Sequence, residues 1–211
     1  MTEFDFTALP ADDRYRLLTN FVGPRPIALV STSGPAGRNA APMSFFNVFS
    51  HEPPIVILGI QTRPDGASKD TVANIRATGE FVVNMVDMAL APAMLVCGLP
   101  FDADVDEILT AGLTPRPGAR VRAPIITEAP CAMECRVEQL IDYDRRVIVL
   151  GLVEFMHVRR DCLDDGGRYV DPAAYQPIAR LHADEYIVPD RQFTLRAPPI
   201  DSIIPIREDA P

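Results

Sequence analysis

The sequence predicts a mainly β protein with a few helices, arranged as a barrel or a sandwich. Three observations support this class. Short runs of apolar residues recur along the chain, proline and glycine separate them, and helical periodicity is confined to two short stretches. The predicted strands are residues 26–32, 39–49, 54–60, 80–86, 131–141 and 146–158.

The composition is that of an ordinary globular protein. Apolar residues make up 47% and charged residues 23% of the 211 residues, which is enough for a sizeable core. No stretch approaches the roughly 18 apolar residues of a membrane span, and the acidic start MTEFDFTALPADD does not resemble a signal peptide. We therefore expect no membrane partner and a cytoplasmic location.

The charge of the chain disfavours polyanionic partners. The net charge is −9, so nucleic acid and anionic lipid are repelled by the protein as a whole. An anionic ligand would need a local concentration of basic groups. The four cysteines and three histidines lack the spacing of a disulfide framework or a zinc site, so we expect buried free thiols and no metal.

The last two predicted strands form a hairpin with different exposures. Residues 131–141 alternate between apolar and charged side chains, as in a strand with one wet face. The turn DYDR leads into residues 146–158, which are apolar on both faces as far as Phe155. A second sheet, a helix or another subunit must cover the outer face of that strand, and we favour a second subunit.

Two short helices are expected between the strands. In SKDTVANIRATG, Ser68 is the expected N-cap, Val72 and Ile75 face the core, and Gly79 ends the helix. In FDADVDEILTAG the expected N-cap is Asp102, the stop is Gly112, and the apolar face consists of Val105, Ile108 and Leu109.

Lys69, the only lysine of the chain, stands at the start of the first of these helices. A helix N-terminus offers unpaired backbone N–H groups and the positive end of the helix dipole. With Ser68, Lys69 and Thr71 added, this end is a candidate cradle for a phosphate group. The alternative is that Ser68 only caps the helix and Lys69 is only solvated. Asp70 is compatible with both readings.

Small side chains mark the second candidate region, residues 39–44. They would let a flat ligand lie against the strand, and Pro42 suggests a sheet edge or a bulge. Close packing at a barrel corner explains the same residues equally well. Arg38, in the preceding glycine-rich turn, is either a ligand contact or an exposed loop charge.

Taken together, these stretches resemble the flavin reductase-like, FMN-binding split-barrel family. The resemblance rests on the order and spacing of PRPIALVST, GRNAAPMSFF, HEPPIVIL, SKDTVANI and GEFVVNMV, and it continues through residues 113–135 and 149–181. It covers about residues 15–190, which leaves an N-terminal extension, 1–14, and a C-terminal arm, 191–211. The family implies a Greek-key antiparallel six-stranded barrel that dimerises and binds FMN near the subunit interface.

The family pattern implies two groups of FMN-binding residues. Those at the phosphate are Ser68, Lys69, Asp70 and Thr71. Those along the isoalloxazine ring are Asn39, Ala40, Ala41, Pro42, Met43, Ser44 and Phe45, with Thr32, Arg38 and Asn47 as neighbours.

One segment departs from the family. Where the family resembles R-L-G-G-x-Y, this chain has Arg180, Leu181, His182, Ala183 and Tyr186. The side chains that replace the glycines fill space on the side where nicotinamide or substrate would approach. Arg180 and His182 are therefore candidate substrate contacts, although His182 could equally be a surface histidine.

The resemblance implies an NAD(P)H-dependent flavin reductase. Nicotinamide would stack on the flavin and pass hydride to its N5, so no catalytic side chain is assigned. A flavoprotein that acts directly on an organic substrate with oxygen, and an FMN-binding electron carrier without turnover, are the alternatives. The expected partners are a second copy of the chain, small-molecule flavin and nicotinamide, and a redox partner or monooxygenase component.

Overall fold

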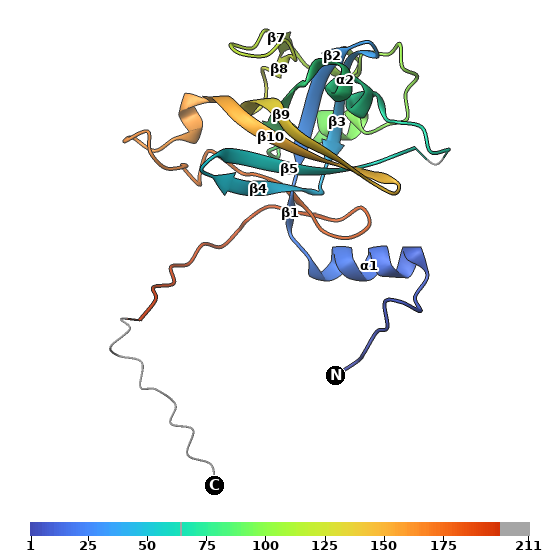
Figure 1. Cartoon of the computed structure of the whole chain (residues 1–211). Helices are drawn as coiled ribbons and strands as arrows, with labels where there is room; N and C mark the ends of the chain where they lie inside the picture. The colour runs from blue at the N-terminus through green and yellow to red at the C-terminus, as the bar shows by residue number, and fades with distance from the viewer. Residues whose placement is uncertain (64, 199–211) are drawn as a thin grey trace.

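The structure, a computed structural model, describes residues 1–63 and 65–198. It confirms the mainly β split-barrel class (Figure 1). Seven antiparallel strands form the main sheet in the order β3-β2-β6-β9-β10-β5-β4. They are β2 (Ala28–Gly34), β3 (Gly37–Met43), β4 (Phe46–His51), β5 (Pro54–Gln61), β6 (Glu80–Met85), β9 (Cys131–Tyr143) and β10 (Arg146–Val158).

Smaller elements decorate this sheet. The short strands are β1 (Arg25–Pro26), β7 (Pro115–Arg116), β8 (Ile125–Ile126), β11 (Ala179–Arg180) and β12 (Tyr186–Ile187). The helices are α1 (Ala11–Phe21), α2 (Asp70–Thr78), α3 (Ala91–Cys97) and α4 (Glu107–Thr110), and Arg160–Cys162 is a 3₁₀ turn. The expected arm, residues 191–211, is described only as far as residue 198 and has no helix or strand there.

The main sheet has one strand more than the six counted from the sequence, because residues 39–49 form two strands. Ser44 and Phe45 lie between the end of β3 and the start of β4 and belong to neither strand. The carbonyl of Phe45 instead accepts a 2.8 Å hydrogen bond from the amide of Gly59 in β5. Strands β3 and β4 thereby become the two edges of the sheet, joined by this turn.

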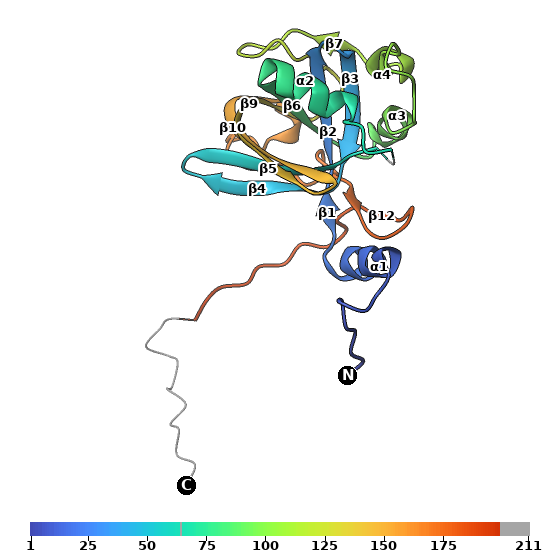
Figure 2. The ribbon, with the colours of Figure 1, turned by 45° about the vertical axis from the view of Figure 1, so that its right-hand side comes forward.

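Apolar side chains fill the barrel and a second layer outside it. The barrel core joins α2 to the strands through buried residues that include Val30, Leu58, Ile75, Phe81 and Val149. A separate cluster, including Leu29, Ala40, Met94 and Ile108, packs β2 and β3 against α3 and α4. Figure 2 shows these two helices beside β3, so β3 lies between two apolar layers.

The hairpin of β9 and β10 behaves partly as predicted. Val147 and Val149 of β10 are buried in the barrel, whereas Phe155 and Met156 are 39% and 55% exposed. Gly151 is required between them, because a Cβ there would overlap the ring of Phe81. No part of the described chain fully covers the outer side of the end of β10.

Helix α2 is fixed to the β2–β3 hairpin by Asn74, which is completely buried. Its side-chain amide donates to the Thr32 hydroxyl (3.1 Å) and the Gly37 carbonyl (3.0 Å), and its Oδ1 accepts from the Ala36 amide (2.9 Å). The middle of α2 is consequently held against the β2–β3 turn and the start of β3.

The two predicted helices begin later than expected. The N-cap of α2 is Lys69 rather than Ser68, and no side chain of the described residues caps it, whereas Gly79 ends the helix with φ 69° as predicted. The N-cap of α4 is Asp106 rather than Asp102, because the Asp106 carboxylate accepts from the Leu109 amide at 3.1 Å. Leu109 itself is exposed, contrary to the expected apolar face.

Helices α1 and α3 were not predicted. Helix α1 lies below the barrel beside β1 (Figures 1 and 2), and Thr19 is its one buried residue. The buried Arg25 guanidinium holds it there, donating to the carbonyls of Thr19 (2.8 Å), Val22 (3.0 Å) and Leu181. The N-terminal helix and the β11–β12 loop therefore share one anchor.

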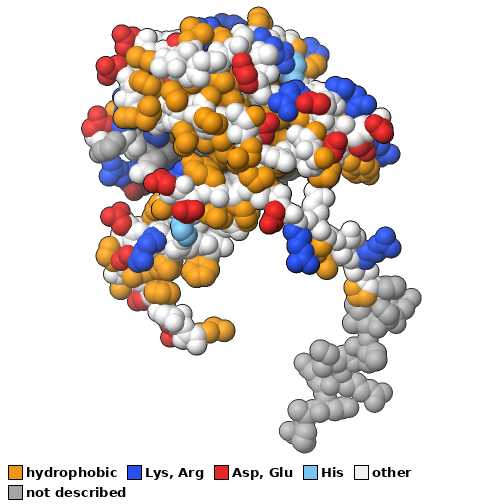
Figure 3. All heavy atoms as spheres, turned by 180° about the vertical axis from the view of Figure 1, so that it is seen from behind, with side chains coloured by type: hydrophobic (Ala, Val, Ile, Leu, Met, Phe, Trp, Pro, Cys, Tyr) orange, Lys and Arg blue, Asp and Glu red, His pale blue; other side chains and the backbone are white. Residues whose placement is uncertain are grey.

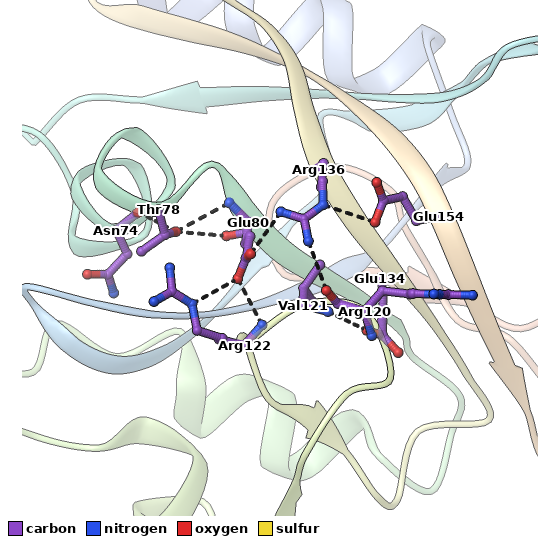
Figure 4. Close-up of polar contacts among 9 residues, drawn as sticks. All are labelled: Asn74, Thr78, Glu80, Arg120, Val121, Arg122, Glu134, Arg136 and Glu154. Carbon is purple, nitrogen blue, oxygen red and sulfur yellow. Dashed lines mark hydrogen bonds and ion pairs between the residues drawn. The ribbon is translucent and has the colours of Figure 1, made fainter.

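A buried carboxylate network surrounds the junction of β6 and β9. Glu80 accepts from Arg136 at 2.9 Å and from the Arg122 amide at 2.8 Å, and Arg136 also pairs with Glu154 at 3.0 Å (Figure 4). These contacts join β6, β9, β10 and the loop before β8, so they fix the closed side of the barrel.

The four cysteines are buried and unpaired, as expected. Burial raises the pKa of Cys97 to about 12 and that of Cys131 to about 11, so both are thiols at neutral pH. Among the described residues, none of the helices is long and apolar enough to span a membrane.

Candidate functional site

The first part of the candidate site is the N-terminus of α2. Lys69 has an extended backbone (φ −68°, ψ 153°), and Ser68 and Lys69 are both exposed. Because no described side chain caps this helix, its first backbone N–H groups, next in sequence to Lys69, have no side-chain acceptor. Amides, ammonium group and hydroxyl together have the donor chemistry that a phosphate dianion needs.

Asp70 and Thr71, assigned to the same cradle, make contacts within the protein. Asp70 forms a 2.6 Å ion pair with Arg63, which holds the preceding loop against the helix. Thr71 is buried and its hydroxyl donates to Oδ1 of Asn39 at 2.8 Å. The Thr71 side chain thus positions the cradle against β3 and leaves phosphate contact to backbone amides and to Ser68 and Lys69.

Asn39 connects the cradle to α4. Its amide Nδ2 donates to Oε1 of the buried Glu107 at 2.9 Å. The Ala40 backbone N–H also points to this carboxylate, at 3.4 Å. Burial raises the pKa of Glu107, while the hydrogen bonds from Asn39 and Ala40 oppose that rise. A polar chain therefore runs from α2 through β3 to α4.

Arg38 is held by an ion pair. Its Nε donates to Asp106 at 2.6 Å, so the guanidinium links β3 to the N-cap of α4. Its side chain is still 37% exposed. The structure thus gives Arg38 a role in holding β3 that neither of the two sequence readings contained.

The second part of the candidate site is the turn between β3 and β4. Ser44, Phe45 and Asn47 line a cavity of about 430 Å³, together with residues 22–26 and β5. Arg146 lies over the Phe45 ring at 5.1 Å, and Tyr15 of α1 meets the same ring edge-on at 6.4 Å. This aromatic corner is therefore held from two sides.

Between these two parts runs β3, an edge strand of small residues. Ala41 and Pro42 are partly exposed, whereas Ala40 and Met43 are buried in the two cores. Thr32 is buried on β2 and bonded to Asn74, so it supports the strand from behind. Asn39 and Ser44 are five residues apart, about 16 Å at the usual rise per residue of a strand.

Arg180 is the last residue of β11, and His182 lies in the loop between β11 and β12. Arg180 contacts the Tyr186 hydroxyl and the Ala183 carbonyl of its own loop and stacks on the Tyr186 ring at 4.6 Å. His182 is exposed. Ala183, at the second family glycine, has φ 44°, a left-handed conformation that glycine adopts without strain.

Sequence reasoning missed three residues that hold this site, Asn74, Asp106 and Glu107. Glu107 lies 68 positions from Asn39 and Asp106 lies 68 positions from Arg38, so no local motif joins the partners. One feature of the sequence could have indicated Asp106 and Glu107: they directly precede the apolar residues 108–109 within a predicted helix.

The donors at α2 and the small-residue edge of β3 fit a phosphorylated flavin. The cradle supplies positive charge and unpaired amides, and Ala41 and Pro42 of the neighbouring strand are small and partly exposed. Of the described residues, no group of three or more His, Cys, Asp or Glu could hold a metal ion.

Comparison with known proteins supports the same fold as the structure. The family model of the flavin reductase like domain matches residues 23–178. A *Deinococcus radiodurans* protein is 42% identical over 186 residues, which are 85% of this chain and 82% of that protein.

Two solved structures are similar over nearly their whole length. The *Pseudomonas fluorescens* 2-nitrobenzoate 2-nitroreductase is 34% identical with a TM-score of 0.84, covering 94% of this chain and 98% of that one. Nitrilotriacetate monooxygenase component B from *Bacillus cereus* is 30% identical with a TM-score of 0.86, covering 92% and 98%. The chain therefore belongs to the flavin reductase like domain family.

Proposed function

We propose that this protein is an FMN-binding, NAD(P)H-dependent flavin reductase. The observation that carries the proposal is the N-terminus of α2, where Lys69 occupies the N-cap position and no described side chain bonds to the first backbone amides. A hydrogen bond from Thr71 to Asn39 fixes this helix end to an edge strand of small residues. The cradle would bind the FMN phosphate, and β3 from Asn39 to Phe45 would support the ring. The bound flavin would supply the chemistry, accepting hydride from nicotinamide at N5.

The protein's own residues would bind and orient the cofactor. Lys69, Ser68 and the first amides of α2 neutralise the phosphate. Backbone groups of the edge strand β3 face the ring, and the chain Thr71–Asn39–Glu107 prevents the strand from shifting relative to the cradle. The aromatic corner of Phe45 and Arg146 excludes water at the end of the ring.

We also propose that the protein acts as a homodimer. Strand β4 is an edge of the sheet, and its Val48 and Phe49 are 64% and 65% exposed. An uncovered apolar edge strand is prone to pair with another chain. Apolar side chains also gather over much of the barrel seen from behind (Figure 3). A second copy covering β4 and the end of β10 would bury the side chains that the monomer leaves open.

A second candidate function is direct reduction of an organic substrate by the bound flavin. The likeness to a 2-nitrobenzoate 2-nitroreductase favours it. The likeness to a monooxygenase component B favours instead a reductase that supplies reduced flavin to a separate oxygenase. The two candidates differ in whether flavin leaves the protein.

The test is oxidation of NADH or NADPH followed at 340 nm, with and without added free FMN. The reductase predicts turnover that rises and saturates with free flavin. Direct reduction predicts turnover that needs a nitroarene such as 2-nitrobenzoate but no free flavin. An electron carrier predicts reduction only by a redox protein.

A parallel measurement tests binding separately from turnover. We expect the purified protein to quench FMN fluorescence and to bind riboflavin, which lacks the phosphate, much more weakly. Equal affinity for FMN and riboflavin would contradict the cradle, and the absence of any flavin binding would overturn the proposed function.

A further inference from the structure

A second cavity lies away from the proposed flavin site. It has a volume of about 330 Å³ and is bordered by the β7–β8 ribbon and by the last residues of β10. These elements meet at one end of the barrel in Figure 1. Its lining includes Arg116, Ile125, Ala129, His157, Val158 and Arg159. None of the residues that line it belongs to the proposed flavin site.

The polar lining of this cavity is basic. Arg116, His157 and Arg159 face it, and no Asp or Glu is among the described residues that line it. This concentration of cationic and histidine side chains stands out in a chain of net charge −9. Such a local arrangement attracts an anion that the protein as a whole would repel.

The two arginines differ in how far they are engaged. Arg159 pairs with Asp161 at 3.2 Å and with the buried Asp87 at 3.5 Å, and it donates to the Glu128 carbonyl at 3.3 Å. Arg116, on β7, makes no side-chain hydrogen bond or ion pair with the described part of the chain. Arg159 thus shapes the wall, and Arg116 is the cation left for a ligand.

His157 is oriented by a buried carboxylate. Its Nε2 lies 2.6 Å from Oε1 of Glu134, which is completely buried. Glu134 also accepts from the backbone amides of Ala119, Arg120 and Val121, in the loop drawn beside it in Figure 4. A carboxylate surrounded by donors in this way accepts a hydrogen bond from Nε2–H, which leaves Nδ1 as the ring nitrogen free for a second contact.

Several observations indicate that Glu134 is ionised. Burial alone would raise the pKa of Glu134, but hydrogen bonds from His157 and the three amides lower it to about 2. Gly118 leaves room for this arrangement, because a Cβ there would lie 2.6 Å from Oε2 of Glu134. The His157 ring is further held by the Phe155 ring, 4.8 Å away.

We propose that this cavity binds a small organic carboxylate. The planar guanidinium of Arg116 matches a carboxylate in geometry and charge. The His157 ring provides a second polar contact, and the apolar wall, including Ile125 and Val158, accepts the carbon skeleton. Arginine binds phosphate as well as carboxylate, so it is the apolar side chains of the wall that favour an organic carboxylate over inorganic phosphate.

Isothermal titration of the full chain with benzoate tests the proposal, with benzyl alcohol and inorganic phosphate as comparison ligands. We expect saturable benzoate binding that is at least about tenfold tighter than binding of either comparison ligand, as a charge-assisted hydrogen bond implies. No saturable benzoate binding, or equal binding of benzyl alcohol, would overturn the proposal. Tighter binding of phosphate would replace the carboxylate by an inorganic anion and would also overturn it.

Two variants and a matched control locate the site. Arg116→Gln and His157→Gln should each weaken benzoate binding about tenfold or more. In His157→Gln, the glutamine amide can still donate a hydrogen bond to Glu134. Arg14→Gln also removes one positive charge, but at an exposed position on α1 that is distant in sequence from the cavity, and it should leave the affinity for benzoate unchanged. An unchanged benzoate affinity in Arg116→Gln would refute the site. If His157→Gln does not fold, Arg116→Gln alone is sufficient to test the proposal.

A titration in the presence of saturating FMN separates this proposal from the proposed function. Benzoate binding should persist, because the two sites share no lining residue. Displacement of benzoate by FMN would show that the anion occupies the flavin site and would overturn the inference. If the protein binds no flavin at all, the benzoate titration still stands on its own.

Discussion

The hydroxyl of Thr71 donates a 2.8 Å hydrogen bond to the side-chain oxygen of Asn39, and both residues are buried. This bond joins the first turn of α2 to the edge strand β3. On the other side, Asn39 donates to Glu107 at 2.9 Å. One amide side chain therefore holds together the proposed phosphate cradle, the ring-supporting strand and α4.

Asn39→Ala should consequently lower the free energy of unfolding by about 2 kcal/mol, because it leaves a buried hydroxyl and a buried carboxylate without their partner. Urea unfolding followed by circular dichroism measures this loss. Asn47→Ala, at an exposed position, is the control and should change stability by less than about 0.5 kcal/mol. Equal stability of the two variants would contradict the bridging role of Asn39.

Lys69→Ala should weaken FMN binding by about 1.5–3 kcal/mol, the range for a hydrogen bond to a charged group. Riboflavin, which has no phosphate, should bind the variant and the original protein alike. Fluorescence titration measures both affinities. Arg14→Ala removes an exposed cation elsewhere and serves as the control. An unchanged FMN dissociation constant in Lys69→Ala would remove Lys69 from the site.

Glu134 should make the protein sensitive to acid. Its pKa is about 2 in the folded chain and about 4.3 in an unfolded one, so the stabilisation is present above about pH 4.3 and is lost as the pH falls towards 2. Glu134→Gln should be less stable at pH 7 and should lose less stability between pH 5 and pH 2.5. Urea unfolding across this range tests it, with the exposed Glu138→Gln as control.

Ala183→Gly should stabilise the protein by about 1 kcal/mol, because Ala183 has φ 44° and a left-handed residue with a Cβ costs about 1–2 kcal/mol. The melting temperature should rise by about 2–4 °C in a chain of this size. Ala173→Gly, where φ is not positive, should give no increase. A fall in the melting temperature of Ala183→Gly would show that the methyl group makes contacts that outweigh the strain.

Phe49→Glu should separate the proposed dimer. We expect the original protein to sediment at twice the chain mass of 23.2 kDa and the variant to sediment at the chain mass, since a charge would be buried at the covered edge of β4. Tyr143→Glu, at a position 71% exposed, is the control. Sedimentation of the original chain as a monomer would contradict the dimer.

Much of the barrel is predictable because its strands are local patterns. The strands at 54–60, 131–141 and 146–158 correspond closely to β5, β9 and β10, since apolar runs bounded by proline or turn residues mark strands. The break at Ser44 and Phe45 is not predictable in this way. The break depends on a hydrogen bond from the amide of Gly59 to the carbonyl of Phe45, and the sequence pattern of residues 39–49 alone predicts one continuous strand.

The candidate site is predictable where it depends on sequence neighbours. The position of Lys69 at the start of α2 follows from a single short stretch, although the expected cap by Ser68 is not formed, and the flavin-binding role of this helix end stays a prediction. The roles of Asn74 and Glu107 are not predictable in this way, because their hydrogen-bond partners are distant in sequence. Helix α1 was not predicted, and Thr19 is the one residue that it buries.

Arg25 has a consequence for how the protein can be shortened. Its guanidinium donates to the carbonyls of Thr19, Val22 and Leu181 at once, while its buried Nε has no hydrogen-bond partner among the described residues. Deleting the first 22 residues would strip two acceptors from a buried cation and loosen the loop that holds His182. A truncation intended only to remove an N-terminal appendage would therefore also alter the segment that follows β11, and α1 should be kept in any shortened form of the protein.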